Sequence, residues 1–154
     1  MMGRFFLQLV VVMALSIVGA VITWAVAPVA TTVVCDAATI EDNEVCLKTV
    51  VESWGDETVL WVDARARKDW ERERVSGAVL LNIDPAEDYE AMLAEAVEGL
   101  AMADRVVVYC GQSGCRASKE IVERLESTGL ARDVRALVGG MKVLKAGNLI
   151  ETVE

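Results

Sequence analysis

The stretch of this sequence with the clearest capacity for chemistry is a cysteine followed by a glycine-containing loop and an arginine. Residues 109–118 read Tyr-Cys-Gly-Gln-Ser-Gly-Cys-Arg-Ala-Ser. Gly111 and Gly114 allow the backbone to curl so that successive amide N–H groups point at one spot, as in loops that hold anions. Arg116 and the positive N-terminal end of a following helix would favour thiolate over thiol at Cys110. The stretch therefore predicts a nucleophilic Cys110 within an anion-binding ring.

The absence of histidine narrows what that nucleophile can do. The chain has no histidine, which removes the commonest general base and the commonest metal ligand, so neither a metal nor a cofactor is expected. A thiolate that accepts a sulfur atom becomes a persulfide anion, which the same N–H groups would stabilise without a base or a metal. The composition thus disfavours papain-like and serine-type catalysis and permits sulfur transfer through Cys110. Cys115 would either form a disulfide with Cys110 or pack at the start of the helix.

Short apolar runs alternate with amphipathic segments along most of the chain, and these elements must position the cysteine. Runs typical of buried strands occupy 58–62, 78–82, 106–109 and 134–138. Helices are expected from the N-cap signature Thr39 and Asp42 to Gly55, after Pro85, over 116–129 and over 141–146, with a surface helix or turn at 67–74. This alternation predicts an α/β fold with a parallel sheet covered by helices on both faces. Cys110 would follow its strand at the carboxyl edge of the sheet, where ligands collect.

Apolar side chains at helical spacing predict which helix faces are buried. The predicted inward residues are Leu47, Val50, Val51 and Trp54 in the first helix, Tyr89, Met92, Leu93, Ala96 and Val97 in the second, and Ile121, Val122 and Leu125 in the third.

From about Thr39 to the C-terminus the sequence resembles the rhodanese family. Residues 62–65 are similar to the family's Asp-x-Arg turn, 77–82 to its Gly-Ala-Ile-Asn-Ile-Pro segment, 107–110 to its active-site strand and nucleophile, and 134–147 to its closing strand, Gly-Gly pair and helix. The resemblance implies a thiosulfate or sulfane sulfurtransferase that forms a persulfide on Cys110. It implies a small anionic donor such as thiosulfate and a thiol or protein acceptor. The binding loop would comprise Gly111, Gln112, Ser113, Gly114, Cys115 and Arg116, and Asp63 and Arg65 would be structural residues near the site.

The loop departs from the usual family pattern, Cys-x-x-Gly-x-Arg-Ser, by one additional residue before Arg116. Cys-x5-Arg is the length in phosphatases and arsenate reductases of the same fold, so such an enzyme is one alternative. Those enzymes tend to carry a histidine where this chain has Tyr109, and the Cys-x4-Cys loop resembles that of membrane-anchored bacterial rhodaneses, which favours sulfur chemistry. Another alternative is a non-catalytic module that senses redox state through Cys110 and Cys115 or docks a partner.

The N-terminal part of the chain predicts a membrane anchor. Residues 5–27 carry no charge and are long enough to cross a bilayer as a helix, too long for the apolar region of a cleaved signal. We expect an anchor at 1–29, a linker at 30–38 and a rhodanese-like domain at 39–154. Arg4 before the apolar run and acidic residues after it orient the domain outward, toward a periplasm or its equivalent.

The chain has 154 residues and a net charge of −9, which disfavours nucleic acid as a partner. In an oxidising compartment Cys35 and Cys46 would form a disulfide; the alternative is two separate thiols.

Overall fold

The computed structural model describes residues 35–111 and 116–153. The predicted anchor at 1–29, most of the linker, and Gln112, Ser113, Gly114 and Cys115 of the predicted binding loop lie outside these described residues. Within the two described ranges, no helix combines the length and apolar character needed to cross a bilayer.

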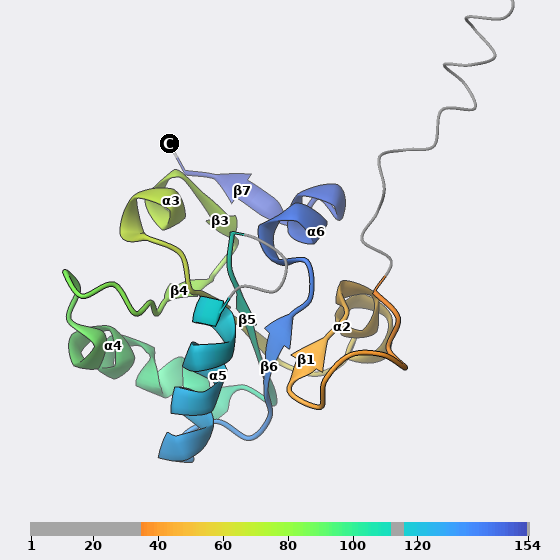
Figure 1. Ribbon diagram of the computed structural model, residues 1–154, viewed down its shortest axis with the longest axis horizontal. Helices are drawn as coiled ribbons and strands as arrows, with labels where there is room; N and C mark the ends of the chain where they lie inside the picture. The colour runs from red at the N-terminus through yellow and green to blue at the C-terminus, as the bar shows by residue number, and fades with distance from the viewer. Residues whose placement is uncertain (1–34, 112–115, 154) are drawn as a thin grey trace, which may run out of the picture. The chain divides into compact units, whose positions relative to one another are not determined.

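A five-stranded parallel sheet forms the centre of the described domain (Figure 1). Its order is β1 (Glu44–Val45), β6 (Val134–Leu137), β5 (Arg105–Tyr109), β2 (Val59–Asp63) and β4 (Val79–Leu80). All four pairings are parallel, as the alternation of strands and helices predicts. In β5, the middle strand, the residues from Val106 to Tyr109 are all buried, because the sheet is covered on both faces.

Helices cover both faces of this sheet, as the sequence predicts. Their bounds are α2 (Leu47–Ser53), α3 (Arg67–Arg72), α4 (Tyr89–Met102), α5 (Arg116–Thr128) and α6 (Gly140–Ala146). One hydrophobic cluster joins the sheet to α4 and α5, and a second joins it to α2 and α6.

The residues of β5 divide between these two clusters, because successive side chains of a strand point to opposite faces. Val106, Val108 and the following Cys110 belong to the cluster formed with α4 and α5. Val107 and Tyr109 belong to the cluster formed with α2 and α6. The side chain of Cys110 therefore lies on the α4 and α5 side of the sheet, and that of Tyr109 on the opposite side.

A second, two-stranded sheet was not predicted. β3 (Glu73–Val75) pairs antiparallel with β7 (Ile150–Thr152), with Arg74 opposite Glu151. The charged stretch 67–74 thus forms a short helix, α3, and then a strand. This pairing brings the end of the chain beside the segment that follows β2.

The prediction for the first helix was wrong at its start. Cys46 is its N-cap, and the predicted cap residue Thr39 instead lies in a turn, where its N–H donates to the Asp36 carbonyl at 2.9 Å. The intervening Glu44–Val45 forms the edge strand β1, because the neighbouring β6 offers hydrogen-bonding partners that the local sequence does not reveal. Val51, predicted to point inward, is 58% exposed, whereas Val50 is buried.

One strand and one helix face differ slightly from what the sequence predicts. Of the predicted strand 78–82, only Val79–Leu80 forms β4, because these two residues pair with the end of β2. Val97, predicted on the buried face of α4, is exposed, and Leu100 is fully buried there instead.

Cys35 and Cys46 form a disulfide, with their Cα atoms 5.6 Å apart. The bond joins the start of the described chain to the residue that caps α2. The sequence left open whether these cysteines pair, and the structure shows that they do.

Candidate active site

The backbone of Cys110 is held at the carboxyl edge of the sheet from both sides. Cys110 follows β5, and its carbonyl accepts a hydrogen bond of 2.8 Å from the N–H of Met141 in the first turn of α6. The carbonyl of the preceding Tyr109 accepts one of 2.8 Å from the N–H of Ala64, just after β2. The predicted nucleophile is therefore fixed by the ends of two elements that are distant from it in sequence.

The side chain of Cys110 is 2% exposed and lies next to a serine hydroxyl. The Oγ of Ser118 is 3.8 Å from Sγ of Cys110 and donates to it. Ser118 is 4% exposed and lies in the first turn of α5. Sequence reasoning gave Ser118 no role. The available signal was its spacing, because Ser118 falls on the same inward stripe as Ile121, Val122 and Leu125.

The structure describes the two ends of the predicted binding loop. Gly111 is exposed, and a Cβ added there would lie 4.0 Å from Cδ of Arg65. Arg116 is the exposed first residue of α5. The ring formed by residues 111–116 remains a prediction, because its middle four residues lie outside the described chain.

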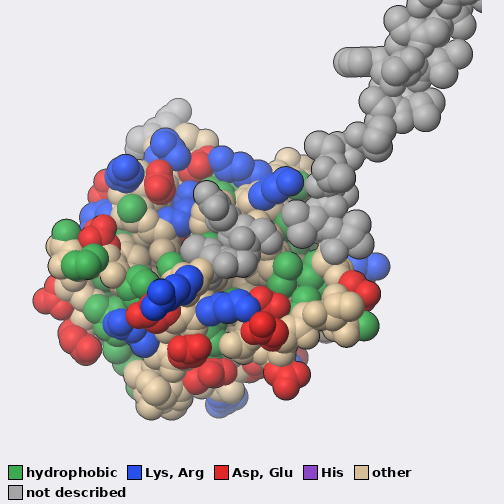
Figure 2. Space-filling view, viewed as in Figure 1, with side chains coloured by type: hydrophobic (Ala, Val, Ile, Leu, Met, Phe, Trp, Pro, Cys, Tyr) green, Lys and Arg blue, Asp and Glu red, His purple; other side chains and the backbone are tan. Residues whose placement is uncertain are grey.

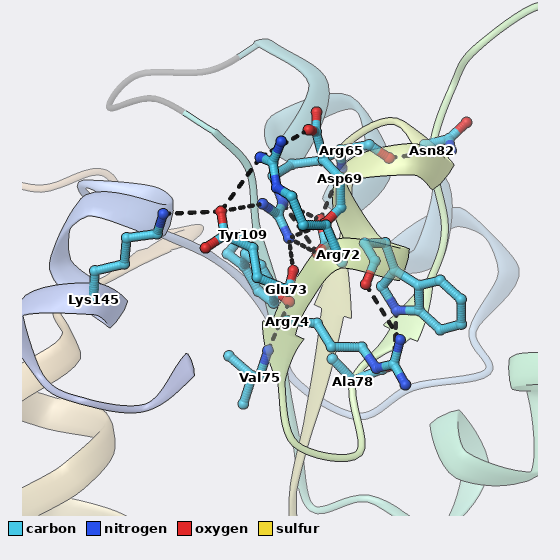
Figure 3. A network of polar contacts seen from close by, with 12 residues as sticks. Arg65, Asp69, Arg72, Glu73, Arg74, Val75, Ala78, Asn82, Tyr109 and Lys145 are labelled. Carbon is cyan, nitrogen blue, oxygen red and sulfur yellow. Dashed lines mark hydrogen bonds and ion pairs between the residues drawn. The ribbon is translucent and has the colours of Figure 1, made fainter. Parts of the chain in front are cut away.

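Asp63, the last residue of β2, forms a buried, two-pronged ion pair with Arg65. Figure 3 shows Arg65 together with Glu73 and Tyr109. Nε of Arg65 lies 2.9 Å from Oδ1 of Asp63, and Nη2 lies 2.7 Å from Oδ2. The Arg65 guanidinium also donates to the Glu73 carbonyl in β3. The backbone carbonyl of Arg65 accepts a hydrogen bond of 3.1 Å from the side-chain amide of Asn82. The pair thus joins the end of β2 to β3 and to the segment after β4, beside the start of the predicted loop.

Tyr109, the residue before the cysteine, is fully buried on the opposite face of the sheet. Its hydroxyl accepts a hydrogen bond of 3.2 Å from the N–H of Val75, and the Arg65 guanidinium lies 5.8 Å from its ring centre. Burial raises the pKa of the Tyr109 phenol, and the charge of Asp63 raises it further. The phenol therefore remains protonated at neutral pH and holds β5 against β3 rather than acting as a base.

Exposed basic side chains lie on α5 and α6, the two helices that contact Cys110, in a chain that is acidic overall. Figure 2 shows Lys and Arg side chains on this face of the domain, with Asp and Glu side chains among them. Arg116 at the start of α5 and Lys142 and Lys145 on α6 are exposed. Nζ of Lys145 also lies 2.8 Å from Oε1 of Glu73, and this contact lowers the pKa of the Glu73 carboxyl. This face is suited to an anionic ligand.

A parallel sheet between helices, whose middle strand ends at a cysteine before the N-terminus of a helix, is the arrangement of a rhodanese-like fold. Residues 48–146 match the rhodanese-like domain family, and the chain belongs to that family. No match was found among curated protein sequences.

Solved structures support the same fold. The rhodanese-like domain of a protein from Anabaena sp. is 23% identical with a TM-score of 0.53, over 73% of this chain and 81% of that one. A protein from Bacillus halodurans is 16% identical with a TM-score of 0.53, over 71% of this chain and 76% of that one. The thiosulfate sulfurtransferase from Pseudomonas aeruginosa is 23% identical with a TM-score of 0.52, over 73% of this chain but only 20% of that one. These similarities concern the fold.

Proposed function

We propose that this protein is a sulfurtransferase that carries sulfur as a persulfide on Cys110. The observation that supports this most directly is the placement of Cys110 at the carboxyl end of the central strand of a rhodanese-like sheet, before the N-terminus of α5. The donor is small and anionic, such as thiosulfate, and the acceptor is a thiol or a protein. The exposed basic side chains of α5 and α6 support an anionic donor, and the fold that the chain shares with a thiosulfate sulfurtransferase indicates which donor to test first.

The proposed reaction has two displacements. The Cys110 thiolate attacks the outer sulfur of thiosulfate, a new sulfur–sulfur bond forms, and sulfite leaves with the electron pair of the broken bond. An acceptor thiolate then attacks the terminal sulfur of the persulfide and regenerates the Cys110 thiolate. Neither step requires histidine, which this chain lacks.

The burial of Cys110 favours a small donor over a bulky one. Its side chain is 2% exposed, so a compact anion has easier access to Sγ than an aryl phosphate has. In the persulfide the reactive sulfur extends one bond beyond Sγ, which brings it closer to a larger acceptor.

The test uses the purified full chain in detergent. We expect thiosulfate and cyanide to yield thiocyanate and sulfite, and a protein treated with thiosulfate alone to gain the mass of one sulfur atom. Cys110→Ser should abolish both signals. Ser127→Ala is the matched control, because Ser127 is exposed at the far end of α5 and should leave the activity unchanged.

The same preparation distinguishes the alternative functions. Release of phosphate from an aryl phosphate, or reduction of arsenate, without sulfur transfer would replace the proposal with an oxyanion enzyme. A reversible disulfide between Cys110 and Cys115 with no turnover of any of these substrates would replace it with a redox-sensing module.

We also propose that residues 1–29 anchor the protein in a membrane with the domain on the extracytoplasmic side. The disulfide between Cys35 and Cys46 supports this, because disulfides persist mainly in oxidising compartments. Protease added to intact spheroplasts should digest the domain, and a maleimide should label Cys35 and Cys46 only after reduction. Protection of the domain together with labelling before reduction would refute this localisation.

A further inference from the structure

Ser118 is placed to act on the sulfur of the proposed nucleophile. Its Oγ lies 3.8 Å from Sγ of Cys110, both side chains are buried, and the hydroxyl is the donor. A hydroxyl donates a stronger hydrogen bond to an ionised acceptor than to a neutral one, and the difference is largest where water is excluded. This contact therefore favours the thiolate over the thiol.

The position of Ser118 within α5 argues against a role in packing alone. The inward stripe of this helix continues with Ile121, Val122 and Leu125, all fully buried. Ser118 is the polar member of that stripe, and alanine would fill a similar volume without a hydroxyl to satisfy. A buried hydroxyl is destabilising unless it has a partner, and Sγ of Cys110 is one such partner.

The described charged groups near Cys110 do not dominate its ionisation, so a hydrogen bond from Ser118 can change it. Asp63 and Arg65, at the end of β2, neutralise each other, and the buried phenol of Tyr109 in β5 is neutral. Arg116 on α5 and Lys142 on α6 are exposed, so solvent screens their charges. The buried residues of α4 in the core cluster of Cys110 are Met92, Ala96 and Leu100, and the phenol-bearing Tyr89 of the same helix packs against that cluster.

We propose that Ser118 is a catalytic residue that stabilises the ionised sulfur of Cys110 by donating its hydroxyl hydrogen. This inference rests on the proposed function in one respect, the identity of Cys110 as the nucleophile. It predicts that loss of the hydroxyl lowers the equilibrium ratio of thiolate to thiol at Cys110 about tenfold at a given pH, the usual magnitude for a hydrogen bond to a charged group.

The test is a pH titration of thiolate absorbance in the ultraviolet, made on the full chain without any sulfur donor. Subtracting the titration of Cys110→Ser isolates the signal of Cys110 from that of Cys115. We expect the midpoint for Ser118→Ala to rise by about one pH unit. Ser118→Thr retains the hydroxyl and should stay within a few tenths of a unit of the parent, as should the surface control Ser127→Ala.

Two results would overturn the proposal. One is an unchanged midpoint in Ser118→Ala with an unchanged circular dichroism spectrum. The other is an equal shift in Ser118→Ala and Ser118→Thr, which would assign the effect to packing. If Ser118→Ala does not fold, the comparison of Ser118→Thr with the parent still decides, because a full-unit shift there refutes the role of the hydroxyl. A shift confined to Ser118→Ala in a protein without sulfur transfer would leave this inference intact and refute the proposed function alone.

Discussion

Two arginines at opposite ends of the sheet each bind acidic side chains, yet in contrasting surroundings. Arg65 lies just after the carboxyl end of β2, where its side chain is 7% exposed and that of Asp63 is 0% exposed. Arg105 is the first residue of β5, where its side chain is 30% exposed and its partners Glu57 and Asp133 are 38% and 21% exposed. The buried cluster lies beside the predicted loop, and the exposed cluster lies at the other end of the same strands.

This difference in burial indicates at which end of the sheet the loss of an ion pair lowers stability more. A buried charge that loses its partner remains unsolvated, so the Asp63 and Arg65 pair cannot open without a large loss of stability. When an exposed ion pair is broken, water solvates the charge that remains, so the free energy of unfolding changes little. The buried pair therefore stabilises the carboxyl edge that holds Cys110 more than the exposed pairs stabilise the opposite edge.

The largest expected effect comes from breaking the buried pair. Arg65→Ala leaves the Asp63 carboxylate without its guanidinium, and we expect the free energy of unfolding to fall by about 3–5 kcal/mol in denaturant titrations. A loss below about 1 kcal/mol would show that Asp63 finds another partner or becomes protonated, and the contrast between the two clusters would fail.

An intermediate effect is expected at alkaline pH, through Tyr109. Its pKa is raised in the folded state, so the stability it contributes is fully present below about pH 10, the ordinary value for tyrosine, and is lost as the pH rises further. Stability should fall by about 1.4 kcal/mol per pH unit in that range from this group. Tyr109→Phe should remove this component while losing the hydrogen bond from Val75 at every pH. Parallel pH profiles for the two proteins above pH 10 would contradict the prediction.

The smallest effect is expected at the exposed cluster. Arg105→Ala should lower the free energy of unfolding by at most about 1 kcal/mol, and the loss should shrink as salt is added. The loss in Arg65→Ala should respond little to salt, because its partner is buried. Equal salt dependence in the two variants would show that the clusters do not differ as their burial indicates.

The sequence predicted those parts of the fold that depend on local patterns. The apolar run of β5 and the stripe of Ile121, Val122 and Leu125 in α5 are local, and the structure has both where they were expected. The strands β1 and β7 were missed, since each is two or three residues long and exists because a distant strand offers hydrogen bonds.

The candidate site divides in the same way. The position of Cys110 after its strand followed from the order of motifs. The contact with Ser118 and the bond from Met141 depend on how α5 and α6 pack, which spacing alone does not determine. The pairing of Cys35 with Cys46 likewise required their separation in space.

The hydrogen bond from Met141 to the carbonyl of Cys110 has a consequence for biogenesis. During translation Cys110 is synthesised thirty-one residues before Met141, whose amide binds its carbonyl. The interval between β3 and its partner strand β7 is longer still. A nascent polypeptide released from the ribosome as far as α5 would thus display the thiol in an unfinished setting. The backbone setting of Cys110 is therefore complete only after the final segment has docked.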